Sequence, residues 1–99
     1  MTHLIFIANA DDAACYNIKR LISITCKSDG VLLLHFESSV GKSDGADTVQ
    51  INIVADSEKE VLIRFFKEIR NKNYIVICDD VTKEYIDSRM TGCVITLDT

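Results

Sequence analysis

The chain has 99 residues, 47% of them apolar and 26% charged, which is the composition of a single globular domain spanning residues 1–99. Its net charge of −4 disfavours binding to nucleic-acid phosphates, and no stretch approaches the roughly 18 apolar residues that cross a membrane. The amino-terminal residues carry no basic leader and the four cysteines are widely spaced, so we expect a cytoplasmic protein with reduced thiols and with neither nucleic acid nor membrane as partner.

The first third of the chain predicts short strands. Residues 3–8 (HLIFIA) form an almost wholly apolar run, which is typical of a strand that is buried on both faces or central in a sheet. Residues 13–19 fit either a short strand or one loose turn of helix. Residues 21–27 and 31–37 alternate between two faces on either side of an Asp-Gly turn, and this pattern predicts a β-hairpin.

The strands of the remaining chain are separated by polar segments. Residues 38–47 are polar and contain glycine, which predicts a mobile loop before a strand at 48–54. Residues 74–78 (YIVIC) and 92–97 (GCVITL) predict two more strands, and the weaker segment 81–90 fits a short helix or a turn. The side chains of the strand at 48–54 that should face inward are Val49, Ile51 and Ile53.

Residues 57–72 (SEKEVLIRFFKEIRNK) are the longest periodic segment and predict an amphipathic helix. Ser57 and Glu60 have the spacing of a capping box, Glu60 and Arg64 that of an i,i+4 ion pair, and Asn71 is a stop signal. Acidic residues gather in the first turn and basic residues in the last, which suits the helix dipole. The apolar side chains that fall within an arc of roughly 140° and should face a sheet are Val61, Leu62, Phe65, Phe66 and Ile69.

Together these elements predict an α+β fold, a mostly antiparallel curved sheet of five to seven strands with the helix at 57–72 packed on one face. The helix joins the strand at 48–54 to the strand at 74–78. If those two strands are parallel, the three elements form a right-handed crossover within a mixed sheet. The sequence leaves the direction of this pair open.

Paired acids follow two of the apolar strands. Asp11 and Asp12 come after the first strand, and Asp79 and Asp80 come after the YIVIC strand. If these strands run parallel and adjacent, the four carboxylates gather at one edge of the sheet, and such oxygen-rich clusters bind Mg²⁺ or Ca²⁺. The alternative is that the acids cap turns and solvate the strand ends.

No arrangement typical of catalysis is found in the sequence. The cysteines at positions 15, 26, 78 and 93 lack the close Cys and His spacing of structural zinc sites. Cys26 and His35 flank the predicted hairpin, but their side chains fall on opposite faces and no third group is placed to orient them as a catalytic pair. We therefore expect no catalytic residue, no cofactor and no enzymatic activity.

The order of several segments along the chain is informative. The segments NADDAACYNIKRLISI, SDGVLLLHFE, YIVICDDVTKEYI and TGCVITL follow one another around the capped helix. In this order the chain resembles small uncharacterised proteins of T4-like phages of marine cyanobacteria. The resemblance implies a phage-encoded protein that works in the host cytoplasm or in the virion, as an accessory assembly component or a host-interaction factor.

The function that the sequence predicts is a non-enzymatic interaction protein, a homo-oligomer or the partner of another protein. The strands at 21–27 and 31–37 carry apolar or β-branched residues on both faces, which indicates partial burial by a partner, and exposed strand edges are natural pairing sites. The alternative is a small metal- or ligand-binding regulatory module that uses the acidic strand ends.

Overall fold

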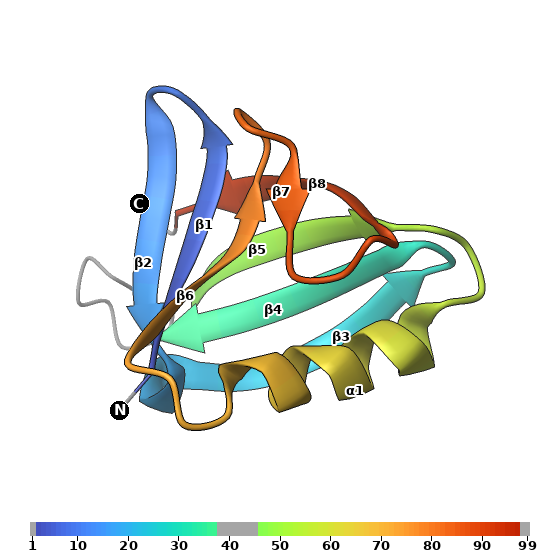
Figure 1. Cartoon of the computed structure of the whole chain (residues 1–99), viewed down its shortest axis with the longest axis horizontal. Coiled ribbons are helices and arrows are strands. Elements are labelled where there is room, and N and C mark those ends of the chain that lie inside the picture. Colours follow the sequence, from blue (N-terminus) through green and yellow to red (C-terminus); the bar gives the residue numbers. More distant parts are fainter. Residues whose placement is uncertain (1, 38–45, 98–99) are drawn as a thin grey trace.

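The computed structural model describes residues 2–37 and 46–97, apart from the side chains of residues 27, 28 and 46. These residues form two four-stranded sheets and one α-helix (Figure 1). Sheet A contains β1 (His3–Asn9), β2 (Asp12–Asn17), β6 (Tyr74–Asp79) and β7 (Glu84–Tyr85). Sheet B contains β3 (Leu21–Ser28), β4 (Val31–Glu37), β5 (Ala46–Ile53) and β8 (Met90–Thr96). The helix is α1 (Glu58–Ile69), and a short 3₁₀ helix, η1 (Ile18–Arg20), links the sheets.

The two sheets differ in strand direction. Sheet A has the order β2-β1-β6-β7, in which β1 is antiparallel to β2 and parallel to β6. Sheet B has the order β3-β4-β5-β8, and each of its pairings is antiparallel. The central position predicted for the first strand is thus confirmed, as is the α+β class with mostly antiparallel strands.

The single curved sheet of five to seven strands is wrong, because the chain changes sheets at η1, at α1 and again between β7 and β8. β5 ends in sheet B, α1 follows, and β6 then adds to β1 in sheet A. The strands that the helix connects therefore do not pair with each other, and the parallel partner of β6 is the strand at the start of the chain. β8 of sheet B lies against β1 and β6, which brings the two sheets face to face.

One hydrophobic core fills the space between the sheets and the helix. The predicted inward face of β5 is confirmed, since Val49, Ile51 and Ile53 are all buried. On β3 the expected alternation fails, because bulges interrupt its pairing with β4 and leave Ile22 60% exposed. The predicted loop at 38–47 lies mostly outside the described residues, and the described part of it, Ala46 and Asp47, is in β5.

An aromatic cluster joins the sheets at the end of the core near η1. Tyr16 of β2 stacks on Phe36 of β4, with ring centroids 4.2 Å apart and planes 9° apart. Phe6 meets both rings at 6.0–6.4 Å in tilted or edge-on geometry. The Tyr16 hydroxyl also donates a 2.8 Å hydrogen bond to the carboxylate of Asp47, which is fully buried.

Helix α1 begins one residue after Ser57 and ends at Ile69, three residues earlier than predicted. Asn71 has a φ of 62°, the left-handed conformation that stops a helix, as its sequence position indicated. The core side of the helix is Val61, Phe65 and Ile69. Phe66 is 51% exposed, so the predicted apolar arc was too wide. Across residues 2–37 and 46–97, no helix has the length and apolar character needed to span a bilayer.

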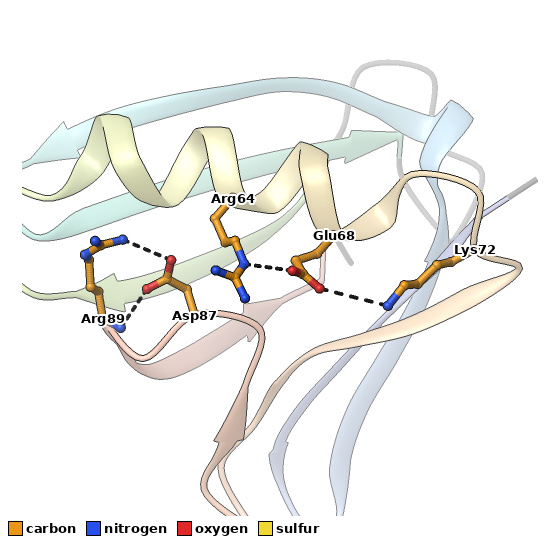
Figure 2. Close-up of polar contacts among 5 residues, drawn as sticks. All are labelled: Arg64, Glu68, Lys72, Asp87 and Arg89. Atoms are coloured by element: carbon orange, nitrogen blue, oxygen red, sulfur yellow. Dashed lines mark hydrogen bonds and ion pairs between the residues drawn. The ribbon is translucent and has the colours of Figure 1, made fainter.

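The predicted polar contacts of the helix are replaced by others. The Ser57 hydroxyl donates to the Val54 carbonyl and makes no cap bond to the helix, so the capping box is wrong. Figure 2 shows Glu68 between Arg64 and Lys72, in contact with both. The Arg64–Glu68 distance is 2.8 Å and the Lys72–Glu68 distance is 3.9 Å. These i,i+4 contacts run along the exposed side of the helix and contribute a few tenths of a kcal/mol each.

Candidate functional site

The parallel pairing that the metal hypothesis required is present. β1 and β6 run side by side, so the acids after both strands lie at one end of sheet A. Asp79 caps the following turn, since its Oδ1 accepts from the backbone N–H groups of Val81 and Thr82 at 3.0 and 3.2 Å. Among Asp11, Asp12, Asp79 and Asp80, only Asp80 belongs to a described group of ligand atoms close enough to share an ion. A Mg²⁺ or Ca²⁺ site formed by all four acids stays a prediction.

Asp80 lies instead in a cluster with two cysteines. The thiols of Cys78 and Cys93 and one Asp80 oxygen are all within 4.8 Å of one another, and we call these three residues the thiol–carboxylate cluster. Cys78 comes from β6 of sheet A and Cys93 from β8 of sheet B. Both cysteines are buried, and Asp80 is half-buried. The cluster therefore lies between the two sheets, with its carboxylate side toward solvent.

A bulge in β6 places Cys78 in this position. The register with β1 shifts after Ile5, which faces Val76, so that Phe6 faces Cys78 and Ile77 is the extra residue. Side chains of a regular strand alternate between faces, and without the extra residue Cys78 would point away from the core. The bulge instead leaves both Ile77 and Cys78 fully buried.

Hydrogen bonds fix the Asp80 carboxylate beside the thiols. Its Oδ1 accepts from the Tyr85 hydroxyl at 2.8 Å, and its Oδ2 accepts from the backbone N–H of Cys93 at 3.1 Å. The Cys78 thiol lies 3.8 Å from Oδ1, and the Cys93 thiol lies 3.6 Å from the Ile7 carbonyl oxygen. The bond to Asp80 and partial burial raise the pKa of Tyr85 to about 12.

The electrostatics of the cluster are dominated by negative groups. The hydrogen bond between the two thiols, burial and the Asp80 carboxylate raise the pKa of Cys78, which is therefore protonated at neutral pH. The same hydrogen bond lowers the pKa of Cys93, while burial and the carboxylates of Asp80, Asp12 and Asp79 act in the opposite direction. The Asp80 carboxylate thus disfavours ionisation of both thiols, while the contact between the thiols favours ionisation of Cys93 alone.

Little in the sequence predicts this cluster. Cys78 and Cys93 are 15 residues apart, and their approach depends on the packing of two sheets rather than on a local motif. The only signal is that one ends the apolar YIVIC run and the other lies within the apolar strand at the end of the chain. Cys15 and Cys26 are exposed and lie outside the cluster.

A second feature is the side of sheet A that points away from the core. Strand alternation places the buried Leu4, Phe6 and Tyr16 on the core side. The opposite side, which we call the outer face of sheet A, is formed by His3, Ile5, Ile7, Ala13, Cys15, Asn17, Tyr74, Val76, Asp79 and Glu84.

The pairing registers arrange the outer face of sheet A in rows. In one row Ile5 lies between Cys15 and Val76, and in the next His3 lies between Asn17 and Tyr74. Tyr74 is 68% and Val76 36% exposed, so this face is open to solvent.

The chain matches no protein-family profile, no curated protein and no solved structure.

Proposed function

We propose that the chain is a non-enzymatic interaction protein that self-associates through the outer face of sheet A. The observation that carries this proposal is the open, uncharged apolar row around Ile5 and Val76. An antiparallel or mixed sheet with one face in water normally carries polar side chains there. The phage resemblance adds a setting for this activity, an accessory assembly or host-interaction role in the cytoplasm of an infected cell.

The absence of charge from the rows around His3 and Ile5 favours a second copy of the chain as the occupant of this face. The rows around His3 and Ile5 contain no Asp, Glu, Lys or Arg, and the two acids of the face, Asp79 and Glu84, lie at its end beside β7. A symmetric dimer places the same patch against itself, so a charge at the centre of the patch would meet the same charge of the second copy. Depletion of charged residues is also the compositional mark of an interface centre.

Helix α1 offers another exposed apolar surface, and its charges are less suited to symmetric contact. Ile63 and Phe66 are both more than half exposed on the outer side of the helix. Lys67 and Arg70 line the same surface as these two residues. In a dimer built on this surface the basic side chains of both copies would come together, which opposes association in water.

The dimensions of the outer face of sheet A predict a weak dimer. Three strands about 4.8 Å apart and about seven residues long, at about 3.3 Å per residue, give a flat footprint of roughly 300 Å². Even with side-chain relief, this area is below the roughly 800 Å² per partner of a standard interface. We therefore expect a concentration-dependent equilibrium rather than an obligate dimer.

Sedimentation equilibrium over a wide concentration range tests the proposal. The wild-type chain should shift from monomer to dimer as concentration rises, and Val76→Glu should remain monomeric because it introduces a charge that faces its own copy. Val94→Glu is the matched control, since Val94 is a 49% exposed valine in a strand of the other sheet. A wild-type chain that stays monomeric at the highest concentration contradicts the proposal, as does a dimer that Val94→Glu or Phe66→Glu abolishes and Val76→Glu leaves intact.

A further inference from the structure

We propose that the thiol–carboxylate cluster is a binding site for one thiophilic divalent cation of the Zn²⁺ class. The protein ligands are the thiolates of Cys78 and Cys93 and the carboxylate of Asp80, and a water completes the tetrahedron. This site is on the core side of β6 and is independent of the proposed self-association on the outer face of sheet A.

The spacing of the ligand atoms fits a tetrahedral ion. Zn–S bonds of about 2.3 Å and Zn–O bonds of about 2.1 Å place two thiolates about 3.8 Å apart and a thiolate and an oxygen about 3.6 Å apart. The Cys78 thiol lies 3.8 Å from Asp80 Oδ1, and all three ligand atoms lie within 4.8 Å. Small side-chain rotations are therefore enough to close the site around an ion.

The negative charge of the cluster also favours binding of a cation. Asp80 forms no ion pair with a Lys, Arg or His among residues 2–37 and 46–97, and Asp12 and Asp79 lie close enough to influence the Cys93 thiol. Two hydrogen bonds stabilise the half-buried carboxylate, but a positive charge is needed to offset the charges of the carboxylate and two thiolates together. A divalent ion supplies that charge and allows both thiols to ionise.

The ligand types select the class of ion. Two thiolates are soft ligands that favour Zn²⁺ and its analogues, whereas Mg²⁺ and Ca²⁺ require oxygen ligands almost exclusively. The Tyr85 hydroxyl and the Cys93 backbone N–H already orient the carboxylate, as outer-shell groups do in metal sites. Because Asp80 is only half-buried, the water ligand and the entering ion have access from its side.

A bound ion would join the two sheets. Cys78 belongs to sheet A and Cys93 to sheet B, so the ion would link β6 to β8 through the core. Binding should therefore raise the thermal stability of the whole domain, since a ligand that binds only the folded state stabilises it.

A disulfide between the same cysteines is the competing use of the cluster. It would remove two electrons and two protons from the thiols and would need a thiol oxidant such as a disulfide compound. The Asp80 carboxylate has no part in that reaction, whereas it completes a metal site. The presence of this third ligand favours the cation.

Cobalt titration of the full-length, fully reduced and chelator-treated chain tests the site. We expect one Co²⁺ per chain, with thiolate-to-cobalt charge-transfer absorption in the near ultraviolet and the visible bands of a tetrahedral ion, and we expect Zn²⁺ to displace it. The double variant Cys15→Ser/Cys26→Ser removes the two exposed thiols and should keep these bands. Asp80→Asn should weaken binding by about 10-fold or more, because a ligand loss costs at least as much as an outer-shell change.

The wild-type chain and the double variant alone can refute the proposal, even if variants of the buried cysteines fail to fold. A reduced wild-type chain without thiolate bands overturns the cation site. Bands that disappear in Cys15→Ser/Cys26→Ser overturn it as well, because the exposed thiols would then be the ligands. If the reduced chain binds no Co²⁺ but loses two thiols on treatment with glutathione disulfide, the cluster is a redox pair and the proposal is wrong.

Discussion

The hydrogen bond from Tyr16 to Asp47 offers a sharp test of how the two sheets are held together. Tyr16 lies in sheet A and Asp47 in sheet B, and their 2.8 Å bond is buried. Tyr16→Phe removes only the hydroxyl. The phenylalanine ring keeps the 4.2 Å stacking on Phe36, so the change isolates the polar link from the aromatic packing.

The expected cost follows from the acceptor. Hydrogen bonds to charged groups contribute about 1.5–3 kcal/mol to stability. Removing the donor leaves the fully buried Asp47 carboxylate with one hydrogen bond fewer, while no cavity larger than an oxygen is created. For a domain of this size each kcal/mol lowers the melting temperature by about 4–8 °C, so Tyr16→Phe should lower it by roughly 6–24 °C.

Urea unfolding followed by circular dichroism measures this cost directly. Tyr74→Phe is the matched control, because Tyr74 is 68% exposed and its hydroxyl has no buried partner to lose. The control should change the free energy of unfolding by less than about 0.5 kcal/mol. If the two variants unfold at the same urea concentration, the Tyr16–Asp47 bond does not hold the sheets together and the reasoning fails.

Two further predictions concern the helix and the cluster. Phe65→Ala should lower the free energy of unfolding in urea by roughly 3–5 kcal/mol because Phe65 is buried. Lys67→Ala, on the exposed side, should leave this free energy nearly unchanged. Similar effects of the two substitutions would mean that the helix packs by another face. The hydrogen bond to Asp80 raises the pKa of Tyr85 to about 12, above the usual value of about 10. The stability that this hydrogen bond contributes is therefore intact below pH ~10 and is lost as the pH rises toward 12. In an alkaline absorbance titration, Asp80→Asn should ionise a tyrosine at lower pH than the wild type, and an unchanged curve would contradict the Tyr85–Asp80 bond.

The parts of the fold that could be predicted from the sequence are those that depend on local periodicity. The alternation in β5 placed Val49, Ile51 and Ile53 in the core without knowledge of the neighbouring strands. The same reasoning failed in β3, where bulges interrupt the alternation and leave Ile22 exposed. A bulge depends on the pairing with the next strand, and no residue pattern in β3 marks it.

Strand pairing between distant parts of the chain could not be determined from the sequence. β1 pairs with β6, about 70 residues later, and this pairing divides the strands into two sheets. It also determines the candidate site, since the bulge at Ile77 turns Cys78 toward Cys93. The sequence identified Asp80 as a potential ligand but paired it with the wrong class of neighbours, because oxygen-rich strand ends are visible in a sequence and thiols meeting across two sheets are not.

The two proposals place different ligands on opposite sides of one strand, and this arrangement makes a prediction. Val76 points to the outer face of sheet A, whereas Cys78 points to the core because of the intervening bulge. Removing metal should therefore leave self-association unchanged within about 0.5 kcal/mol, or about twofold in the dissociation constant, as expected for independent sites. Sedimentation equilibrium of the wild-type chain with excess Zn²⁺ and with excess chelator measures the difference. A dimer that forms only with Zn²⁺ would show that the ion bridges two copies, in which case the cluster would be part of the interface and the two faces of β6 could not be separate sites.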